Sequence, residues 1–345
     1  MSLSKERREE IESIIINKIG LSSDGQLVQK QIADECGVSA QSVSRIMTKM
    51  VNSGRLLKQK KGQKNIYILP DDNIFFTYPL EGLEEDKVYR ENVADFIRDV
   101  PKCAKDNFTH AFLEMLNNAI EHSGGTEVDI FIKRNDSFLT FIIHDNGVGV
   151  FTKVADELNL DEKRYAILEL AKGKFTSDPD SHSGEGIFFS SKCGDCFVLE
   201  SDGIAYVAKQ TYAALGDGEP SLRPGTFVLF KINVNHQQTM EELFKQYTDA
   251  PERYGFSKTA IPIHLLEYGD KSPIFISRSQ ARRLLARVER FEVVNLDFSG
   301  IDSIGQGFAD EIFRVFKKRH PDILLIPVNC TDAVNQMIQH VLEYK

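Results

Sequence analysis

The sequence has no long apolar segment. Its longest apolar runs, such as 323–328, are far shorter than the roughly 20 residues that a membrane-spanning helix needs. The first residues, MSLSKERREE, are charged and lack the apolar core of a signal peptide. Only five cysteines are present, an odd number scattered along the chain. These absences argue against a membrane protein, a signal peptide and a disulfide framework, so we expect a cytoplasmic protein with reduced thiols.

The sequence has the size and composition of a multidomain globular protein. Its 345 residues are too many for one ordinary core, and 41% hydrophobic with 27% charged residues is a globular composition. Apolar runs of period two alternate with helical patterns, which predicts an α/β (α+β) fold with helices on sheets. Breaks in these patterns predict three modules: residues 1–70, 75–240 and 272–345.

Charge is divided unevenly between the two ends of the chain. Residues 1–70 hold 12 basic and 7 acidic side chains, a net charge of +5, whereas the remainder holds 30 basic and 44 acidic, a net charge of −14. A basic segment on an acidic body predicts that the basic segment meets a polyanion.

Residues 31–50 read as two helices joined by a tight turn. Small and apolar positions have the spacing of a helix-turn-helix: Ala33, Gly37, Val43 and Ile46. A lysine-rich hairpin at 56–69 follows, and the whole resembles the bacterial winged helix-turn-helix family, which implies binding to double-stranded DNA. Dimerisation or protein docking is the alternative, but the basic hairpin favours DNA. The candidate contacts to bases and phosphates are Gln41, Ser42, Arg45, Lys49, Lys58, Lys60, Lys61 and Lys64.

The clearest chemical pattern is FLEMLNNAIEHS at residues 112–123. Glu114 and Asn118 are four residues apart, so they would share one face of a helix. The amide oxygen of Asn118 suits a hard cation such as Mg²⁺. The carboxylate of Glu114 can orient or deprotonate a water that attacks a γ-phosphate.

Three further motifs follow in order: DNGVG at 145–149, SGEGI at 183–187 and PGTF at 224–227. Asp145 ends an apolar strand, where its carboxylate can accept the exocyclic amine of adenine. Gly184 and Gly186 come before a helical pattern and can present backbone N–H groups to phosphate oxygens. Thr226 opens a strand and can support Asp145 through its hydroxyl.

The four motifs in this order resemble the N, G1, G2 and G3 boxes of the GHKL superfamily, which contains gyrase, heat-shock chaperone, histidine kinase and mismatch-repair ATPases. The resemblance implies a Bergerat-type α/β sandwich that binds ATP with Mg²⁺, with Asn118 as the metal ligand and Glu114 as the catalytic carboxylate. Residues 150–183 would form a lid, from which Lys172 and Lys174 can reach the γ-phosphate. The ATP-binding residues that it implies are Asn118, Asp145, Gly147, Gly149, Lys174, Gly184, Gly186 and Thr226.

Two other functions, a histidine kinase and a zinc site, are less consistent with the sequence. No helical hairpin with a phosphoacceptor histidine precedes the ATP motifs, so histidine autokinase activity is not expected, and the short layout is most similar to anti-sigma-factor serine kinases. The pair Cys193 and Cys196 has the CxxC spacing of a zinc site but lacks a second pair or nearby histidines. We therefore interpret this pair as structural.

The last segment has the order strand, glycine-rich turn, helix, strand, helix. Its sequence LDFSGIDSIGQG, residues 296–307, resembles the LDxSGxxxxDSSG signature of STAS domains in anti-sigma-factor antagonists. Ile304 occupies the position of the phosphorylated serine in that family. Ser303 remains beside it, and we expect it to be a helix N-cap.

Together these patterns predict a nucleotide-controlled transcriptional regulator that binds DNA through its first module. The alternative is a serine/threonine protein kinase or ATPase of the anti-sigma-factor type that acts on a partner protein. A structural adaptor with an inactive ATP site is disfavoured because Glu114 and Asn118 are both present. Whether ATP is turned over and whether the chain forms a homodimer stay open, and no membrane partner is expected.

Overall fold

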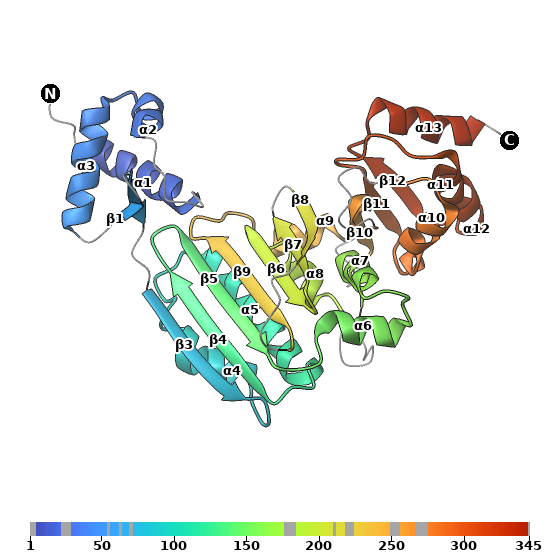
Figure 1. The fold of residues 1–345 in the computed structure, drawn as a ribbon, viewed down its shortest axis with the longest axis horizontal. Coiled ribbons are helices and arrows are strands. Elements are labelled where there is room, and N and C mark those ends of the chain that lie inside the picture. Colours follow the sequence, from blue (N-terminus) through green and yellow to red (C-terminus); the bar gives the residue numbers. More distant parts are fainter. Residues whose placement is uncertain are drawn as a thin grey trace.

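The computed structural model describes residues 5–21, 29–53, 56–61, 64–68, 72–175, 184–209, 212–217, 224–248, 256–266 and 275–343. Within these ranges helices accompany sheets of two, seven and three strands, so the predicted mixed α/β class is confirmed. Figure 1 shows the three sheets one after another along the molecule, with the chain termini at opposite ends. No helix in the described ranges combines the length and apolar character that crossing a membrane requires.

The first segment, residues 5–68, is called the head here. Its apolar core is separate from that of the rest of the chain and includes Ile15, Val43 and Ile46. Gly37 adopts a φ of +62° in the turn between its second and third helices, which is a conformation that favours glycine. Its elements are α1 (Lys5–Leu21), α2 (Gln29–Cys36), α3 (Ala40–Asn52) and the antiparallel pair β1 (Leu57–Lys61) and β2 (Lys64–Ile68).

The central sheet is antiparallel throughout, with the order β3-β4-β5-β9-β6-β7-β8. Its strands are β3 (Asp72–Pro79), β4 (Glu127–Arg134), β5 (Phe138–Asp145), β6 (Cys196–Ser201), β7 (Ile204–Lys209), β8 (Tyr212–Asp217) and β9 (Phe227–Asn233). Burial alternates along the inner strands, because successive side chains point to opposite faces.

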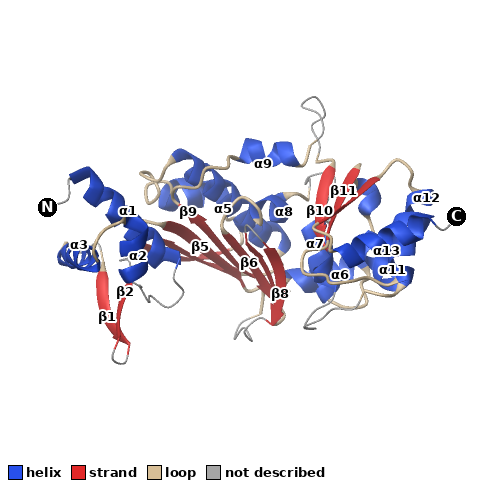
Figure 2. Ribbon diagram, turned by 90° about the horizontal axis from the view of Figure 1, so that it is seen from above, coloured by secondary structure: helices blue, strands red, loops and turns tan. Residues whose placement is uncertain are grey.

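One long helix, α5 (Lys102–His122), covers one face of the central sheet (Figure 2). The rings of Phe108 and Phe112 on this helix meet Phe141 of β5, with ring centroids 5.3 and 5.6 Å apart. This packing sets the face of α5 that carries the predicted Glu114–Asn118 pair. The other helices are α4 (Glu85–Val88), which continues into a π-helical turn (Tyr89–Val93), α6 (Val150–Leu158), α7 (Arg164–Lys172), α8 (Gly186–Ser190) and α9 (Met240–Gln246).

The last part of the chain, residues 256–343, is called the tail here. Its parallel sheet has the order β10-β11-β12, from β10 (Lys258–Pro262), β11 (Val293–Asp297) and β12 (Leu324–Val328). Its helices are α10 (Arg278–Leu285), α11 (Gln306–Asp310), α12 (Lys317–Arg319) and α13 (Asp332–Glu343); residues 311–316 join α11 to α12 as a π-helical segment, and residues 263–266 and 288–290 form 3₁₀ turns. The sheet therefore includes β10, which precedes the expected start at 272, because a five-residue strand carries little periodic signal.

The predicted N-cap role of Ser303 is wrong. Helix α11 begins at Gln306, and its N-cap is Gly305, with no side-chain cap. Ile304 forms a parallel bridge with Phe275, whose carbonyl accepts the Gly305 N–H at 2.7 Å. This bridge keeps the chain extended past Ser303, so the serine lies exposed in the turn before the helix.

Candidate functional site

A cavity of about 300 Å³ lies beside α5, at the end of β5 and the starts of α6 and α8. Residues from all four predicted motifs line it: Glu114, Asn118, Asp145, Gly184, Gly186 and Thr226. The pairing of β5 with β9 brings two of these motifs together, since the Asp145 N–H donates to the Thr226 carbonyl at 3.1 Å. Residues that are far apart in the sequence thus share one wall.

Asp145 is a buried carboxylate, only 4% exposed, at one end of the cavity. Its Oδ1 accepts the backbone N–H groups of Gly147 at 2.9 Å and Thr226 at 3.2 Å. Burial raises the pKa of Asp145, and these hydrogen bonds offset part of that rise. The Thr226 hydroxyl in turn accepts the Val150 N–H at 3.0 Å, which ties the start of β9 to α6.

The close approach of the backbone to Asp145 requires glycine at position 225. Its φ is +111°, and an added Cβ would lie 1.9 Å from the Asp145 carbonyl oxygen. Gly147 and Gly149 do not line the cavity but shape this end of it, since Gly147 donates to Asp145 and Gly149 comes immediately before α6. The DNGVG and PGTF motifs therefore act together to hold one carboxylate.

Glu114 and Asn118 lie half-buried on the cavity side of α5, as their spacing predicts. The Asn118 amide nitrogen donates to Sδ of Met115 at 4.0 Å, so the amide oxygen is the atom that a cation would meet. The backbone of Gly186 lies against Glu114, since an added Cβ would be 2.2 Å from Oε2. Gly184 (φ +70°) approaches the Phe175 carbonyl oxygen closely, at 2.4 Å from an added Cβ.

Lys174 lies away from the cavity, in contrast to its predicted role beside the γ-phosphate. Its ammonium donates to the Arg290 carbonyl at 3.0 Å and lies 4.9 Å from the centre of the Phe291 ring. To bind a phosphate in the cavity, the Lys174 ammonium would have to leave these partners. Part of the predicted lid, 176–183, lies outside the described residues.

Sequence reasoning missed a basic residue of the cavity wall. Lys153, on α6, lines the cavity, and its ammonium donates to the His122 carbonyl at 3.0 Å. His122 itself also lines the cavity. The only signal in the sequence is the position of Lys153, one helical turn after Gly149.

Metal ligands are sparse around this cavity. Within the described ranges no group of three or more His, Cys, Asp or Glu side chains could hold a metal ion. Mg²⁺ often takes few protein ligands and completes its coordination shell with phosphate oxygens and water. A single oxygen ligand such as that of Asn118 would therefore suit Mg²⁺ that is bound to a phosphate. The alternative zinc pair consists of two free thiols, and the Cys193 thiol is buried and donates to the Asn107 carbonyl.

The head presents most of its predicted contact residues at the surface. Gln41, Arg45 and Lys49 are exposed along α3, and Lys58 and Lys60 are exposed on β1. The hydroxyl of Ser42 instead meets that of Ser39, the N-cap of α3, at 2.9 Å. Lys61 and Lys64 pair at the end of the hairpin, but their side chains lie outside the described part of the structure.

Comparisons with known proteins support one of the three predicted modules. Residues 280–335 match a family described as a STAS-like domain of unknown function (DUF4325), which confirms the predicted STAS-like character of the tail. Residues 9–70 match a domain of unknown function (DUF7343), and no curated protein matches the chain.

Among solved structures, an IclR transcriptional regulator from Alicyclobacillus acidocaldarius aligns with 68% of this chain and 91% of its own, at 14% identity and a TM-score of 0.22. A TM-score of 0.22 does not indicate a shared fold.

Proposed function

We propose that the chain is an ATP-binding transcriptional regulator, with Mg²⁺–ATP in the cavity of the central module and double-stranded DNA on the head. The observation that carries this proposal is the convergence of four separate motifs on one cavity. A buried carboxylate at one end suits a hydrogen-bond donor such as the adenine amine, and the Glu114–Asn118 pair suits a metal-bound phosphate at the other. The resemblance to GHKL ATPases agrees with this assignment.

The residues present fit the nucleotide by the chemistry of their donors. Asp145 would accept the adenine amine, Asn118 would offer its oxygen to Mg²⁺, and the Lys153 ammonium would lie on the same wall as the phosphates. The backbone at Gly184 and Gly186 has no side chain that would fill the space beside Glu114 and Phe175. Bound ATP supplies a transferable γ-phosphoryl group, and Glu114 would hold or deprotonate the group that attacks it.

A route from the cavity to the tail supports a regulatory use of the nucleotide. Leu170 and Phe175 line the cavity, while Lys172 and Lys174, in the same short stretch, donate to backbone carbonyls of the tail. A nucleotide that moves this stretch would change how the tail is held. We propose that this docking, in turn, sets the reach or dimer state of the head.

The DNA assignment rests on the head alone. Its exposed basic and polar side chains lie on a helix and the hairpin that follows it, which is the arrangement of a winged helix-turn-helix. The alternative function, a serine/threonine kinase or ATPase that acts on a partner protein, is favoured by Glu114 in the cavity. In that case the head would only contact protein.

Titration of the full chain with ATP, with and without Mg²⁺, tests the nucleotide proposal. We expect Mg²⁺-dependent binding that Asn118→Ala removes, and tight Mg²⁺-dependent binding by that variant would refute the site. Incubation with γ-labelled ATP, with and without DNA, separates the alternatives. Label in free phosphate indicates an ATPase, label in protein indicates a kinase, and label in neither indicates a binding switch.

A further inference from the structure

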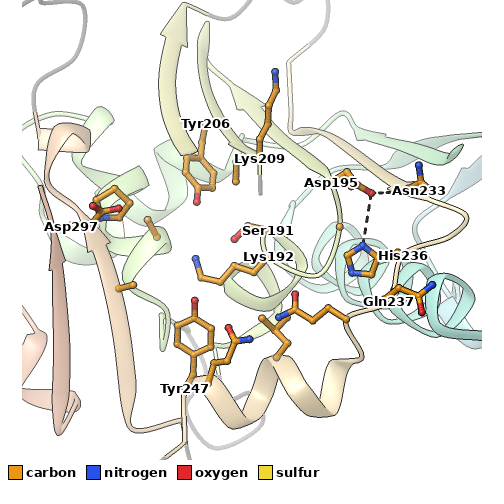
Figure 3. A pocket seen from close by; sticks show the side chains of 18 of the residues that line it. Ser191, Lys192, Asp195, Tyr206, Lys209, Asn233, His236, Gln237, Tyr247 and Asp297 are labelled. Carbon is orange, nitrogen blue, oxygen red and sulfur yellow. Dashed lines mark hydrogen bonds and ion pairs between the residues drawn. The ribbon is translucent and has the colours of Figure 1, made fainter. Parts of the chain in front are cut away.

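A second cavity, of about 760 Å³, lies where the central module meets the tail (Figure 3). Its lining residues come from the end of α7, the turn after α8, strands β7, β9, β10 and β11, and the segment around α9. It shares no lining residue with the first cavity. Its volume is within the range of about 300–1,000 Å³ that is typical of small-molecule sites.

Polar tips of four side chains face the same space in this cavity. Figure 3 shows the Lys192 ammonium and the hydroxyls of Ser191, Tyr206 and Tyr247 facing the same space. Ser191 and Lys192 are neighbours in the turn after α8, and the Ser191 hydroxyl donates to the Phe188 carbonyl at 2.7 Å. Tyr206 is only 2% exposed, and burial raises its pKa to about 12. Burial also raises the pKa of Tyr247. Both phenols therefore keep their protons near neutral pH and can donate hydrogen bonds.

Within the part of the chain that the structure describes, no carboxylate pairs with Lys192. Its ammonium lies 4.3 Å from the centre of the Phe188 ring and 5.9 Å from that of Tyr247. The ammonium makes these ring contacts but, among the described residues, no hydrogen bond or ion pair. Burial lowers its pKa to about 8, and burial is the whole cause. A bound anion would remove this penalty.

The carboxylates of the cavity wall are already engaged elsewhere. Asp195 accepts the Asn233 N–H and lies 4.0 Å from Nδ1 of His236. Asp297 accepts from the side chains of Ser299 and Asn329. The wall also carries a second lysine, Lys209. The Lys192 ammonium lies against the Phe188 and Tyr247 rings rather than against either carboxylate. A single ammonium that faces the cavity, with no carboxylate of the described residues beside it, matches a ligand with one negative charge.

We propose that this cavity binds a small organic monocarboxylate, whose carboxylate pairs with Lys192 and accepts hydrogen bonds from the phenols of Tyr206 and Tyr247. Side-chain amides on the wall, among them Gln237 and Gln246, would hydrogen-bond the polar parts of its body. Ala260 and Pro262 place the tail in the same wall, so the ligand would contact both modules at once. Bound there, it would stabilise their docking independently of the nucleotide.

The test treats the full chain with a trace of an amine-reactive reagent and measures the rate of Lys192 modification by mass spectrometry. The probes are acetate, butyrate and phenylacetate, with phenylacetamide as the uncharged match and inorganic phosphate as the dianion. At least one carboxylate should slow Lys192 modification about tenfold, the effect of roughly one charge-assisted contact. Lys231, whose ammonium lies 3.8 Å from the centre of the Phe138 ring outside the cavity, is the internal control.

Equilibrium binding of the protective carboxylate gives a second, independent readout. Lys192→Met should lower its affinity about tenfold or more, whereas Lys231→Met, which removes the same charge beside another ring, should leave it unchanged. Protection by none of the carboxylates, equal protection by phenylacetamide, or stronger protection by phosphate would each overturn the proposal.

Discussion

Lys172 forms a buried ion pair with Glu169, with 2.7 Å between Nζ and Oε1, at the junction of α7 and the tail. The same ammonium donates to the Ala286 carbonyl at 2.8 Å, and the Lys172 carbonyl accepts the Thr259 hydroxyl at 2.7 Å. Burial lowers the pKa of Lys172, and Glu169 offsets part of that shift. The lysine, which is 1% exposed, thus joins the central module to the tail.

Lys172→Met should destabilise the protein by about 3 kcal/mol, because Glu169 would remain buried and, among the described residues, would keep Arg287, at 3.4 Å, as its one charged partner. Denaturant unfolding of the full chain measures this loss. Lys245→Met is the matched control, since Lys245 pairs with Glu241 at the surface, where solvent screens the pair, and its loss should change stability little. Equal small losses in both variants would show that the buried pair does not hold the junction.

Glu114→Gln should retain ATP binding and lower any hydrolysis about 100-fold, since a positioned general base contributes that much or more. Phosphate release and nucleotide affinity are measured on the same sample. Glu121→Gln, on the same helix but outside the cavity wall, should leave both unchanged. Loss of binding in Glu114→Gln would make this residue structural.

Asp145→Asn should weaken the preference for ATP over GTP by about tenfold, because an amide offers a donor as well as an acceptor to the base. For the unchanged protein, affinity should fall as pH drops through the pKa of Asp145, which burial places above the ordinary value of 3.8. The fall should therefore begin at a higher pH than an exposed aspartate would give. Asp156→Asn, exposed on α6, is the control, and unchanged selectivity in Asp145→Asn would remove its role with adenine.

Lys58→Ala with Lys60→Ala should weaken DNA binding to a similar extent for all sequences. The slope of log affinity against log salt should fall by about 2, roughly 0.9 for each lost phosphate contact. Arg45→Ala should also reduce sequence preference, because Arg45 is exposed on α3. As a control, Lys318→Ala with Arg319→Ala removes the same charge from the tail and should leave DNA affinity unchanged. If the unchanged protein shows no DNA affinity even at low salt, the protein-docking alternative is favoured.

Ser303 should not acquire stoichiometric phosphate when the chain is incubated with ATP and Mg²⁺. The position that matches the acceptor serine of STAS domains is Ile304, a buried side chain with no nucleophilic oxygen. Mass spectrometry of the intact chain and of its peptides measures this, with Ser303→Ala as the control. Ser303 is exposed, so a kinase that acts on the tail would reach it, and full occupancy there would favour the kinase alternative.

Local spacing was sufficient to predict the parts of the candidate site that lie within one element. Glu114 and Asn118 share a helix face because four residues make about one turn, and the strand before Asp145 follows from its alternating apolar pattern. The LDFSGIDSIGQG motif likewise indicated a STAS-like tail from its own residues. Each of these inferences depends on neighbours in the sequence.

Only the tertiary structure decided which distant groups meet. The register of β5 with β9 sets Thr226 beside Asp145, and the bridge from Phe275 to Ile304 moves the start of α11 past Ser303. Two lysines that look alike in the sequence, Lys172 and Lys174, bind the tail, while Lys153 lines the cavity. Buried charges must find partners to offset the cost of desolvation, and those partners come from segments that no local pattern brings together.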